Sequence, residues 1–177
     1  MEPRSSKAKN HLLFIPSAIT SIRLCIFPFL LFSYVNGFTL ITDTFFLIVL
    51  LSDFADGYVA RKLHVPSGLG AVFDASVDFL FIGGMFLEFT SIGMYPQWVF
   101  PLTVFMFTQF AITSLVFRRV FDPLGKYYGS LLYGAIGLTI LFPQKTSVNI
   151  ITTAFLLVSV ACLASRINYL AIKKNTS

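Results

Sequence analysis

Charged residues are scarce in this chain. Only 12% of its 177 residues are charged, 56% are hydrophobic, and the mean hydropathy is +0.80. A soluble domain usually carries about 25% charged residues, so this chain has too few charges to cover the surface of a soluble globule. The composition therefore predicts an all-α, polytopic membrane protein rather than a soluble domain.

Cysteine and histidine are scarce as well, with two residues of each. Cys25 and Cys162 lie in separate apolar runs and have no metal-ligand spacing. His11 and His64 sit at the predicted edges of helices and form no pair. These residues argue against a cysteine–histidine metal centre, and we expect structural or interfacial roles for all four.

Six apolar runs follow one another, separated by breaks that contain proline, glycine or polar residues. Because each is about the length of a membrane helix, they predict six transmembrane helices. The first opens after Pro16 and closes at Asn36-Gly37. We find no internal repeat and expect residues 1–177 to form a single domain. The runs cover about residues 17–36, 39–62, 70–93, 97–119, 125–142 and 148–172.

The basic residues fall almost entirely on one side of this predicted topology. Every Lys and Arg except Lys145 lies at the ends that an even number of spans would bring together. The positive-inside rule then places both termini in the cytoplasm. A basic rim facing anionic headgroups and phosphorylated substrates accounts for the pI of about 9.4, so the charge does not argue for nucleic-acid binding.

Acidic residues are few, and their placement is unusual. The chain has eight Asp and Glu residues, and four of them, Asp53, Asp56, Asp74 and Asp78, lie in or beside two successive apolar runs. A carboxylate within a membrane span costs several kcal/mol unless it is paired, hydrated or bound to a cation. Four neighbouring carboxylates also repel one another. Bound cations would remove both difficulties.

The spacing of these aspartates fits a cation site. Asp53 and Asp56 are about 60° apart around one helix, and Asp74 and Asp78 are about 40° apart around the next. A short connection makes the two helices antiparallel neighbours, so their acidic stripes can face each other. Oxygen ligands of this kind suit Mg²⁺ or Mn²⁺, and four carboxylates are enough for two metal ions.

Small residues and one arginine accompany the aspartates. Gly57 and Ala60 lie on the Asp56 side of their helix, and Gly70 comes one turn before Asp74. These residues suit either tight helix packing or a bulky headgroup that approaches the backbone. Arg61 suits either a topology anchor or a phosphate contact. Beside the carboxylates, we favour the headgroup and the phosphate.

Taken together, these residues read Asp53-x2-Asp56-Gly57-x2-Ala60-Arg61-x8-Gly70-x3-Asp74-x3-Asp78. This pattern resembles the signature of the CDP-alcohol phosphatidyltransferase family at every fixed position. The resemblance implies a reaction in which a CDP-linked lipid donor gives its phosphatidyl group to a small alcohol acceptor and CMP is released. It implies that the four aspartates bind two Mg²⁺ or Mn²⁺ ions, with Asp78 also acting as general base. It further implies that Gly57, Ala60, Arg61 and Gly70 bind the CDP part of the donor.

The acceptor alcohol is less distinctly marked. Arg118, Arg119 and Lys126 form a basic group that either binds an acceptor phosphate or anchors the helix ends; Arg23 and Arg166 are candidates to join it. Residues 15–23 and 52–62 resemble phosphatidylglycerophosphate synthases within the family, which favours glycerol 3-phosphate. Ala75, Phe79 and the Tyr127-Tyr128 pair depart from that group. Inositol phosphate and amino alcohols therefore stay open as acceptors.

Two other classes of function compete with the enzyme. Intramembrane acids also occur in divalent-cation transporters. Here, however, the acids cluster at one membrane face, and no polar path continues to the other. A non-catalytic membrane scaffold would leave Asp78 unexplained. We therefore expect an integral membrane enzyme in the lipid bilayer with a cytoplasmic active site, and a homodimer is compatible with it.

Overall fold

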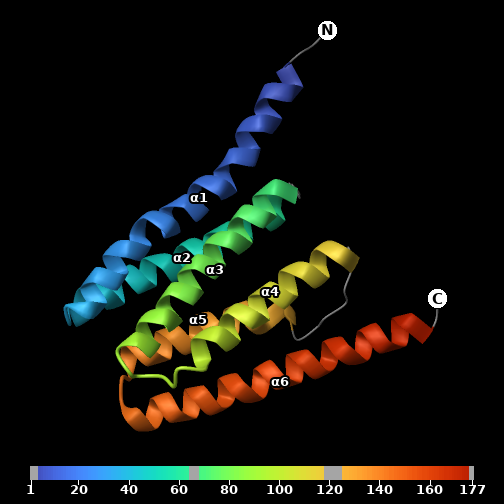
Figure 1. The fold of residues 1–177 in the computed structure, drawn as a ribbon. Coiled ribbons are helices and arrows are strands. Elements are labelled where there is room, and N and C mark those ends of the chain that lie inside the picture. Colours follow the sequence, from blue (N-terminus) through green and yellow to red (C-terminus); the bar gives the residue numbers. More distant parts are fainter. Residues whose placement is uncertain (1–3, 64–67, 118–124, 176–177) are drawn as a thin grey trace. The chain divides into compact units, whose positions relative to one another are not determined.

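The computed structural model describes residues 4–63, 68–117 and 125–175. These residues form six α-helices and no β-strand, which confirms the all-α prediction (Figure 1). Apolar runs separated by turn residues account for this series of helices. The helices are α1 (Arg4–Val35), α2 (Thr39–Leu63), α3 (Gly68–Ser91), α4 (Val99–Phe117), α5 (Gly125–Leu141) and α6 (Lys145–Asn175).

The bounds of four helices lie within a few residues of the prediction, but α1 and α6 are longer than predicted. The expectation that the first helix opens after Pro16 is wrong, because α1 already begins at Arg4. Pro16 and Pro28 both lie inside α1. A proline inside a helix removes one backbone hydrogen bond and bends the helix without necessarily ending it. The bent course of α1 agrees with this (Figure 1).

Glycines with positive φ end two helices. Gly37 has φ 71° and follows α1, and Gly93 has φ 73° and follows α3. At the first end, the Phe38 N–H donates to the Ser33 carbonyl at 2.9 Å; at the second, the Met94 N–H donates to the Phe89 carbonyl at 2.9 Å. Both ends are Schellman motifs, in which glycine adopts the left-handed conformation at low cost. The predicted break at Asn36-Gly37 is confirmed.

The chain divides into two compact units, Met1–Phe81 and Ile82–Ser177, and the division falls inside α3. In the first unit, α1 packs along α2. Leu30 and Val49 are fully buried there. Beside the Gly37 turn, the Ser33 and Thr42 hydroxyls form a buried hydrogen bond of 2.9 Å. This bond joins the two helices next to their connection.

Aromatic rings form the centre of the second unit. The Phe86 ring lies 5.7 Å from the Tyr95 ring and 5.6 Å from the Phe155 ring, centroid to centroid. The Tyr95 hydroxyl also forms a 2.7 Å hydrogen bond with the Thr139 hydroxyl. Burial raises the pKa of the Tyr95 phenol, which keeps it protonated. Aromatic contacts and buried hydroxyl pairs thus link α3, α5 and α6 within this unit.

One helical stretch in the described part of the chain is long and apolar enough to cross a membrane by length and composition alone. It is Lys145–Tyr169, within α6. Shorter apolar stretches lie in other helices, at Thr20–Val35, Val99–Ile112 and Tyr127–Leu141. The prediction of six helices is confirmed. Because only one of these stretches has the length and composition of a span, the prediction that all six helices cross a membrane remains an expectation.

Candidate functional site

Three of the four predicted aspartates have described side chains, and all three lie in the first unit. Asp53 comes from α2, and Asp74 and Asp78 come from the first half of α3. Their side chains are 39%, 42% and 26% exposed, respectively. A carboxylate that is partly exposed keeps some hydration and can still be reached by a ligand. These three side chains are therefore partly accessible to solvent rather than fully buried in the packing.

The three carboxylates converge on one cation, the guanidinium of Arg23 on α1. Arg23 Nη2 lies 3.1 Å from Asp53 Oδ1, and Arg23 Nη1 lies 3.6 Å from Asp74 Oδ1. The same Nη1 donates a hydrogen bond to Asp78 Oδ1. The Arg23 side chain is 0% exposed. The facing acidic stripes predicted from the spacing are confirmed for these three aspartates.

Thr20 adds a neutral contact to the same cluster. It lies almost one turn before Arg23 on α1, and its Oγ1 donates a 3.2 Å hydrogen bond to Asp74 Oδ1. Thr20 is 2% exposed. Since a hydroxyl carries no charge, it can hold the Asp74 carboxylate without changing the net charge of the cluster.

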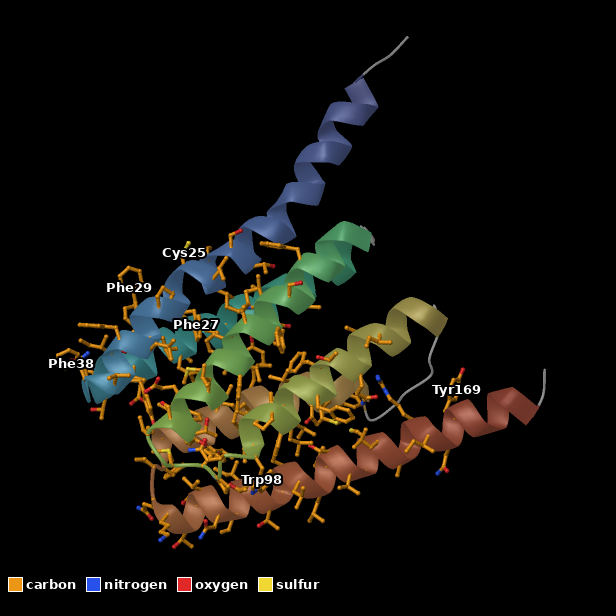
Figure 2. All side chains as sticks on the ribbon, viewed as in Figure 1. Cys25, Phe27, Phe29, Phe38, Trp98 and Tyr169 are labelled. Carbon is orange, nitrogen blue, oxygen red and sulfur yellow. The ribbon has the colours of Figure 1, made fainter. Side chains whose placement is uncertain are left out.

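Apolar packing of α1 against α3 positions the charged groups. The Phe27 ring meets the Phe81 ring edge-on with centroids 5.4 Å apart, and Figure 2 labels Phe27 on this helix. Phe27 follows Arg23 by about one turn, and Phe81 follows Asp78 by almost one turn. Val77, beside Asp78 in the sequence, is 2% exposed. The aromatic pair therefore brings α1 against α3 close to the Arg23–Asp78 contact.

Other predicted site residues lie where the structure describes only the backbone or nothing. Asp56, Gly57, Ala60 and Arg61 belong to α2, and Gly70 belongs to α3, but only their helical backbone is described. Lys126 belongs to α5, and likewise only its backbone is described. Arg118 and Arg119 lie outside the described residues entirely. The predictions for these residues stay predictions.

Sequence reasoning missed two members of the cluster, or gave them another role. Arg23 was interpreted as a flanking basic residue with a possible part in acceptor binding, whereas the structure pairs it with three aspartates. Thr20 was not singled out. A signal was present, because an arginine inside an apolar run needs an acidic partner as much as an intramembrane aspartate needs a basic one. Thr20 and Arg23 are also three residues apart, on one side of their helix.

Arg166, the other basic residue considered beside Arg23, belongs to the second unit. It lies on α6 and is 4% exposed. Its Nη1 is 3.3 Å from the Gln109 carbonyl oxygen and 3.4 Å from the Gln109 side-chain oxygen. Its guanidinium also lies over the Phe110 ring, 4.6 Å from the centroid. Arg166 therefore joins α6 to α4 within that unit.

The described residues contain no group of three or more His, Cys, Asp or Glu side chains arranged to hold a metal ion. The chemistry of the cluster nevertheless fits a hard divalent cation. Carboxylate oxygens from α2 and α3 converge on one positive group, and oxygen ligands are those that Mg²⁺ and Mn²⁺ prefer.

Comparison with known proteins agrees with the motif. Residues 13–172 match the sequence profile of the CDP-alcohol phosphatidyltransferase family. The chain belongs to this family, because the match covers most of its length.

Named relatives include two kinds of phospholipid-synthesising enzyme. A "Putative cardiolipin synthase" of Mycobacterium tuberculosis (strain ATCC 25618 / H37Rv) is 33% identical over 108 residues, which are 59% of this chain and 49% of the relative. A "CDP-diacylglycerol--glycerol-3-phosphate 3-phosphatidyltransferase" of Bacillus subtilis (strain 168) is 29% identical over 91 residues, 51% of this chain and 45% of the relative. A protein of the same name from Aquifex aeolicus (strain VF5) is 26% identical over 132 residues, 72% of this chain and 73% of the relative. The matches thus span about half the length of the first two relatives.

Proposed function

We propose that this protein transfers a phosphatidyl group from a CDP-linked lipid to an alcohol, with release of CMP, and that the acceptor is glycerol 3-phosphate. One structural observation supports the proposal most directly. Asp53, Asp74 and Asp78 reach one place from two helices and gather around a single cation. Family membership and the names of the Bacillus and Aquifex relatives support the reaction and its acceptor.

Two divalent metal ions, Mg²⁺ or Mn²⁺, belong to this proposal. The carboxylates of Asp53, Asp56, Asp74 and Asp78 would hold them. When bound, the ions would neutralise charge on the diphosphate of the donor and on the departing CMP. The aspartates supply oxygen ligands, and their partial exposure leaves room for a substrate to approach.

Asp78 has the role of general base in the proposed reaction. Its carboxylate accepts the proton of the acceptor hydroxyl while that oxygen bonds to the phosphorus of the phosphatidyl group. The bond from this phosphorus to the CMP oxygen breaks, and CMP leaves with the electron pair. Among the three described aspartates, Asp78 has the least exposed side chain, at 26%. Its position at the same cation as Asp53 and Asp74 supports a role beside the donor's diphosphate.

The donor pocket is assigned from the motif. Gly57 and Ala60 follow Asp56 along α2, and Gly70 precedes Asp74 on α3. Small side chains at these positions would let the cytidine approach the helix backbones. Arg61, one residue beyond Ala60, would contact the diphosphate through charge-assisted hydrogen bonds.

The acceptor phosphate would need cations beyond those that serve the donor. Arg118, Arg119 and Lys126 are the candidates, because they lie together at one connection of the chain. A second candidate acceptor is the glycerol headgroup of phosphatidylglycerol. The relatives named cardiolipin synthase favour it, because adding a phosphatidyl group to phosphatidylglycerol yields cardiolipin.

The enzyme would work in a lipid bilayer, with its helices crossing the membrane and both termini and the aspartates at the cytoplasmic side. Large apolar side chains on the surface of the first unit support this placement. Leu40 is 79% exposed, Phe54 is 72% exposed and Phe32 is 64% exposed. Buried threonines also donate hydrogen bonds from their hydroxyls to carbonyl oxygens of their own helix, as Thr103 does to Val99 and Thr152 to Val148. Such bonds satisfy polar groups where no water is present.

A direct assay tests the proposal. Purified full-length protein would be supplied with CDP-diacylglycerol, Mg²⁺ or Mn²⁺ and one acceptor at a time. The acceptors are glycerol 3-phosphate, phosphatidylglycerol, inositol 1-phosphate and serine, and the signal is CMP release. We expect the fastest release with glycerol 3-phosphate. Faster release with phosphatidylglycerol would assign the second acceptor, and no release with any acceptor would contradict the enzyme.

The transporter alternative is tested separately in proteoliposomes. Metal-dependent CMP release without movement of Mn²⁺ across the membrane would support the transferase. Movement of Mn²⁺ without CMP release would support a divalent-cation transporter instead.

A further inference from the structure

Arg23 lies fully buried at the point where the aspartates meet. Its two terminal nitrogens divide the cluster, with Nη2 on Asp53 and Nη1 on Asp74 and Asp78. In each aspartate the contacting atom is Oδ1. One guanidinium therefore engages one oxygen of every described carboxylate in the proposed metal site.

This arrangement solves an electrostatic problem that exists without metal. Three neighbouring carboxylates repel one another, and the repulsion is strong where water is scarce. A guanidinium can offset it from a single position, because its planar fork donates in several directions at once. A lysine ammonium, as a point charge, would match this spread of partners less well. Arg23 thus keeps α2 and α3 together through α1.

The same arrangement conflicts with a loaded site. A dication near the three carboxylates would lie within a few ångströms of a buried positive charge, and the two would repel. It would also draw on carboxylate oxygens that Arg23 holds. Both ions cannot keep their full set of contacts with Asp53, Asp74 and Asp78.

We propose that Arg23 is an internal counter-ion that holds Asp53, Asp74 and Asp78 together in the metal-free protein and gives up these contacts when divalent metal binds. This inference rests on the metal requirement in the proposed function. Thr20 complements the exchange. Its neutral hydroxyl holds Asp74 at 3.2 Å and does not repel a metal ion, so one carboxylate stays in place while Arg23 moves.

Mn²⁺ binding by the metal-stripped, full-length protein tests the exchange. Free Mn²⁺ is measured by electron paramagnetic resonance during titration of the wild type, Arg23→Gln and Arg23→Lys. Arg166→Gln is the matched control, because Arg166 is also a buried arginine but lies against Gln109 and Phe110. Removing one positive charge from the cluster should tighten Mn²⁺ binding on the order of tenfold in Arg23→Gln. Arg23→Lys should tighten it less, and Arg166→Gln should leave it unchanged.

Thermal unfolding gives a second measurement on the same proteins. Arg23→Gln should lower the Tm of the metal-free protein, because the carboxylates then repel without their counter-ion. Added Mn²⁺ should raise the Tm of this variant more than it raises that of the wild type. A purely structural role for Arg23 predicts the opposite for binding, because a damaged site holds Mn²⁺ more weakly.

The outcomes separate the two proposals. Unchanged or weaker Mn²⁺ binding by Arg23→Gln, with normal binding by the wild type, overturns the exchange and leaves the proposed function standing. A wild type that binds no Mn²⁺ and no Mg²⁺ overturns the metal requirement and the exchange with it. If Arg23→Gln does not fold, Arg23→Lys decides, and binding no tighter than that of the wild type overturns the exchange.

Discussion

The two units of the chain bury an arginine in different ways. In the first unit, Arg23 meets three carboxylates from α2 and α3. In the second unit, Arg166 lies against the carbonyl and amide oxygens of Gln109 and the ring of Phe110. The contacts of Arg166 are of a kind that stabilises a folded unit. Those of Arg23 gather three carboxylates, which in the proposed exchange would pass from one cation to another, and the proposed chemistry would then lie in the first unit.

The interiors of the two units also differ, because one contains charged groups and the other contains aromatic rings and neutral hydroxyls. The first unit has an ionic cluster of partly exposed carboxylates around a buried cation. The second has the Phe86, Tyr95 and Phe155 rings, together with hydroxyl pairs such as Tyr128 with Ser159 at 2.9 Å. If this contrast reflects function, changes in the first unit should affect turnover, and changes in the second should affect stability.

The largest expected effect is on turnover, from Asp78→Asn. Loss of a general base typically costs 10²- to 10⁴-fold, so CMP release should fall by about that factor. Asparagine keeps an oxygen that can accept the hydrogen bond from Arg23, and donor binding should be largely retained. Turnover is measured by CMP release, and donor binding by equilibrium titration with CDP-diacylglycerol.

Asp43→Asn is the matched control for this variant, because Asp43 also lies on α2 but about 15 Å along the helix from Asp53. It should release CMP at the wild-type rate. Turnover by Asp78→Asn within a few-fold of the wild type would contradict the general-base role and weaken the contrast between the units.

A change in the second unit should act on stability instead. Phe86 is fully buried among aromatic rings, and Phe86→Ala would leave a cavity there. We expect the free energy of unfolding to fall by about 3 kcal/mol, measured by denaturant titration in detergent. Phe105→Ala, at a side chain that is 54% exposed, should cost much less. Equal losses for the two variants would show that the aromatic cluster does not stabilise this unit.

The candidate acceptor residues test whether only the first unit takes part in the reaction. Arg118 and Arg119 belong to the second unit by sequence. If they bind the acceptor phosphate, Arg119→Ala should raise the KM for glycerol 3-phosphate by roughly tenfold with little change in kcat, because a charge-assisted hydrogen bond contributes about 1.5 kcal/mol or more. Steady-state CMP release measures both constants. Unchanged KM in Arg118→Ala and in Arg119→Ala would identify these residues as anchors and confine the chemistry to the first unit.

The smallest expected effect is from Tyr128→Phe. This change removes one buried hydrogen bond between α5 and α6 and should lower the free energy of unfolding by about 1 kcal/mol. Tyr127→Phe, at a neighbouring side chain that is 59% exposed, should change it by less than about 0.5 kcal/mol. Denaturant titration compares the two variants. A larger loss for Tyr127→Phe would contradict the assigned hydrogen bond.

The sequence predicted the helices and the three described carboxylates of the ionic cluster, but not the partners Arg23 and Thr20. Periodicity and turn residues located all six helices in the described part of the chain, because each apolar run ends at residues that favour turns. The spacing of Asp53, Asp74 and Asp78 correctly predicted that their side chains face one place. Both results depend on local features of the sequence, namely apolar runs with turn residues for the helices and helical spacing with a short connection for the aspartates.

Interactions between distant segments were harder to predict. The predicted start of α1 was wrong because Pro16 is tolerated inside a bent helix. Whether a helix tolerates a proline depends on the packing around it. The partners of Arg23 were missed because Asp53, Asp74 and Asp78 are between 30 and 55 residues away along the chain. Topology rules count an arginine by its place in the sequence, whereas its electrostatic role depends on which carboxylates the fold brings to it.

The hydroxyl pair of Ser33 and Thr42 has a consequence for the site that lies farther along both helices. Arg23 precedes Ser33 by ten residues and Asp53 follows Thr42 by eleven, so helical rise places them about 15 and 17 Å from the pair. The pair thus fixes a point from which Arg23 and Asp53 lie at nearly equal distances along their helices. One residue inserted between Arg23 and Ser33, or between Thr42 and Asp53, would shift the charged residue by about 1.5 Å and rotate it by about 100° around its helix. Arg23 would then face away from Asp53, although neither residue had been changed.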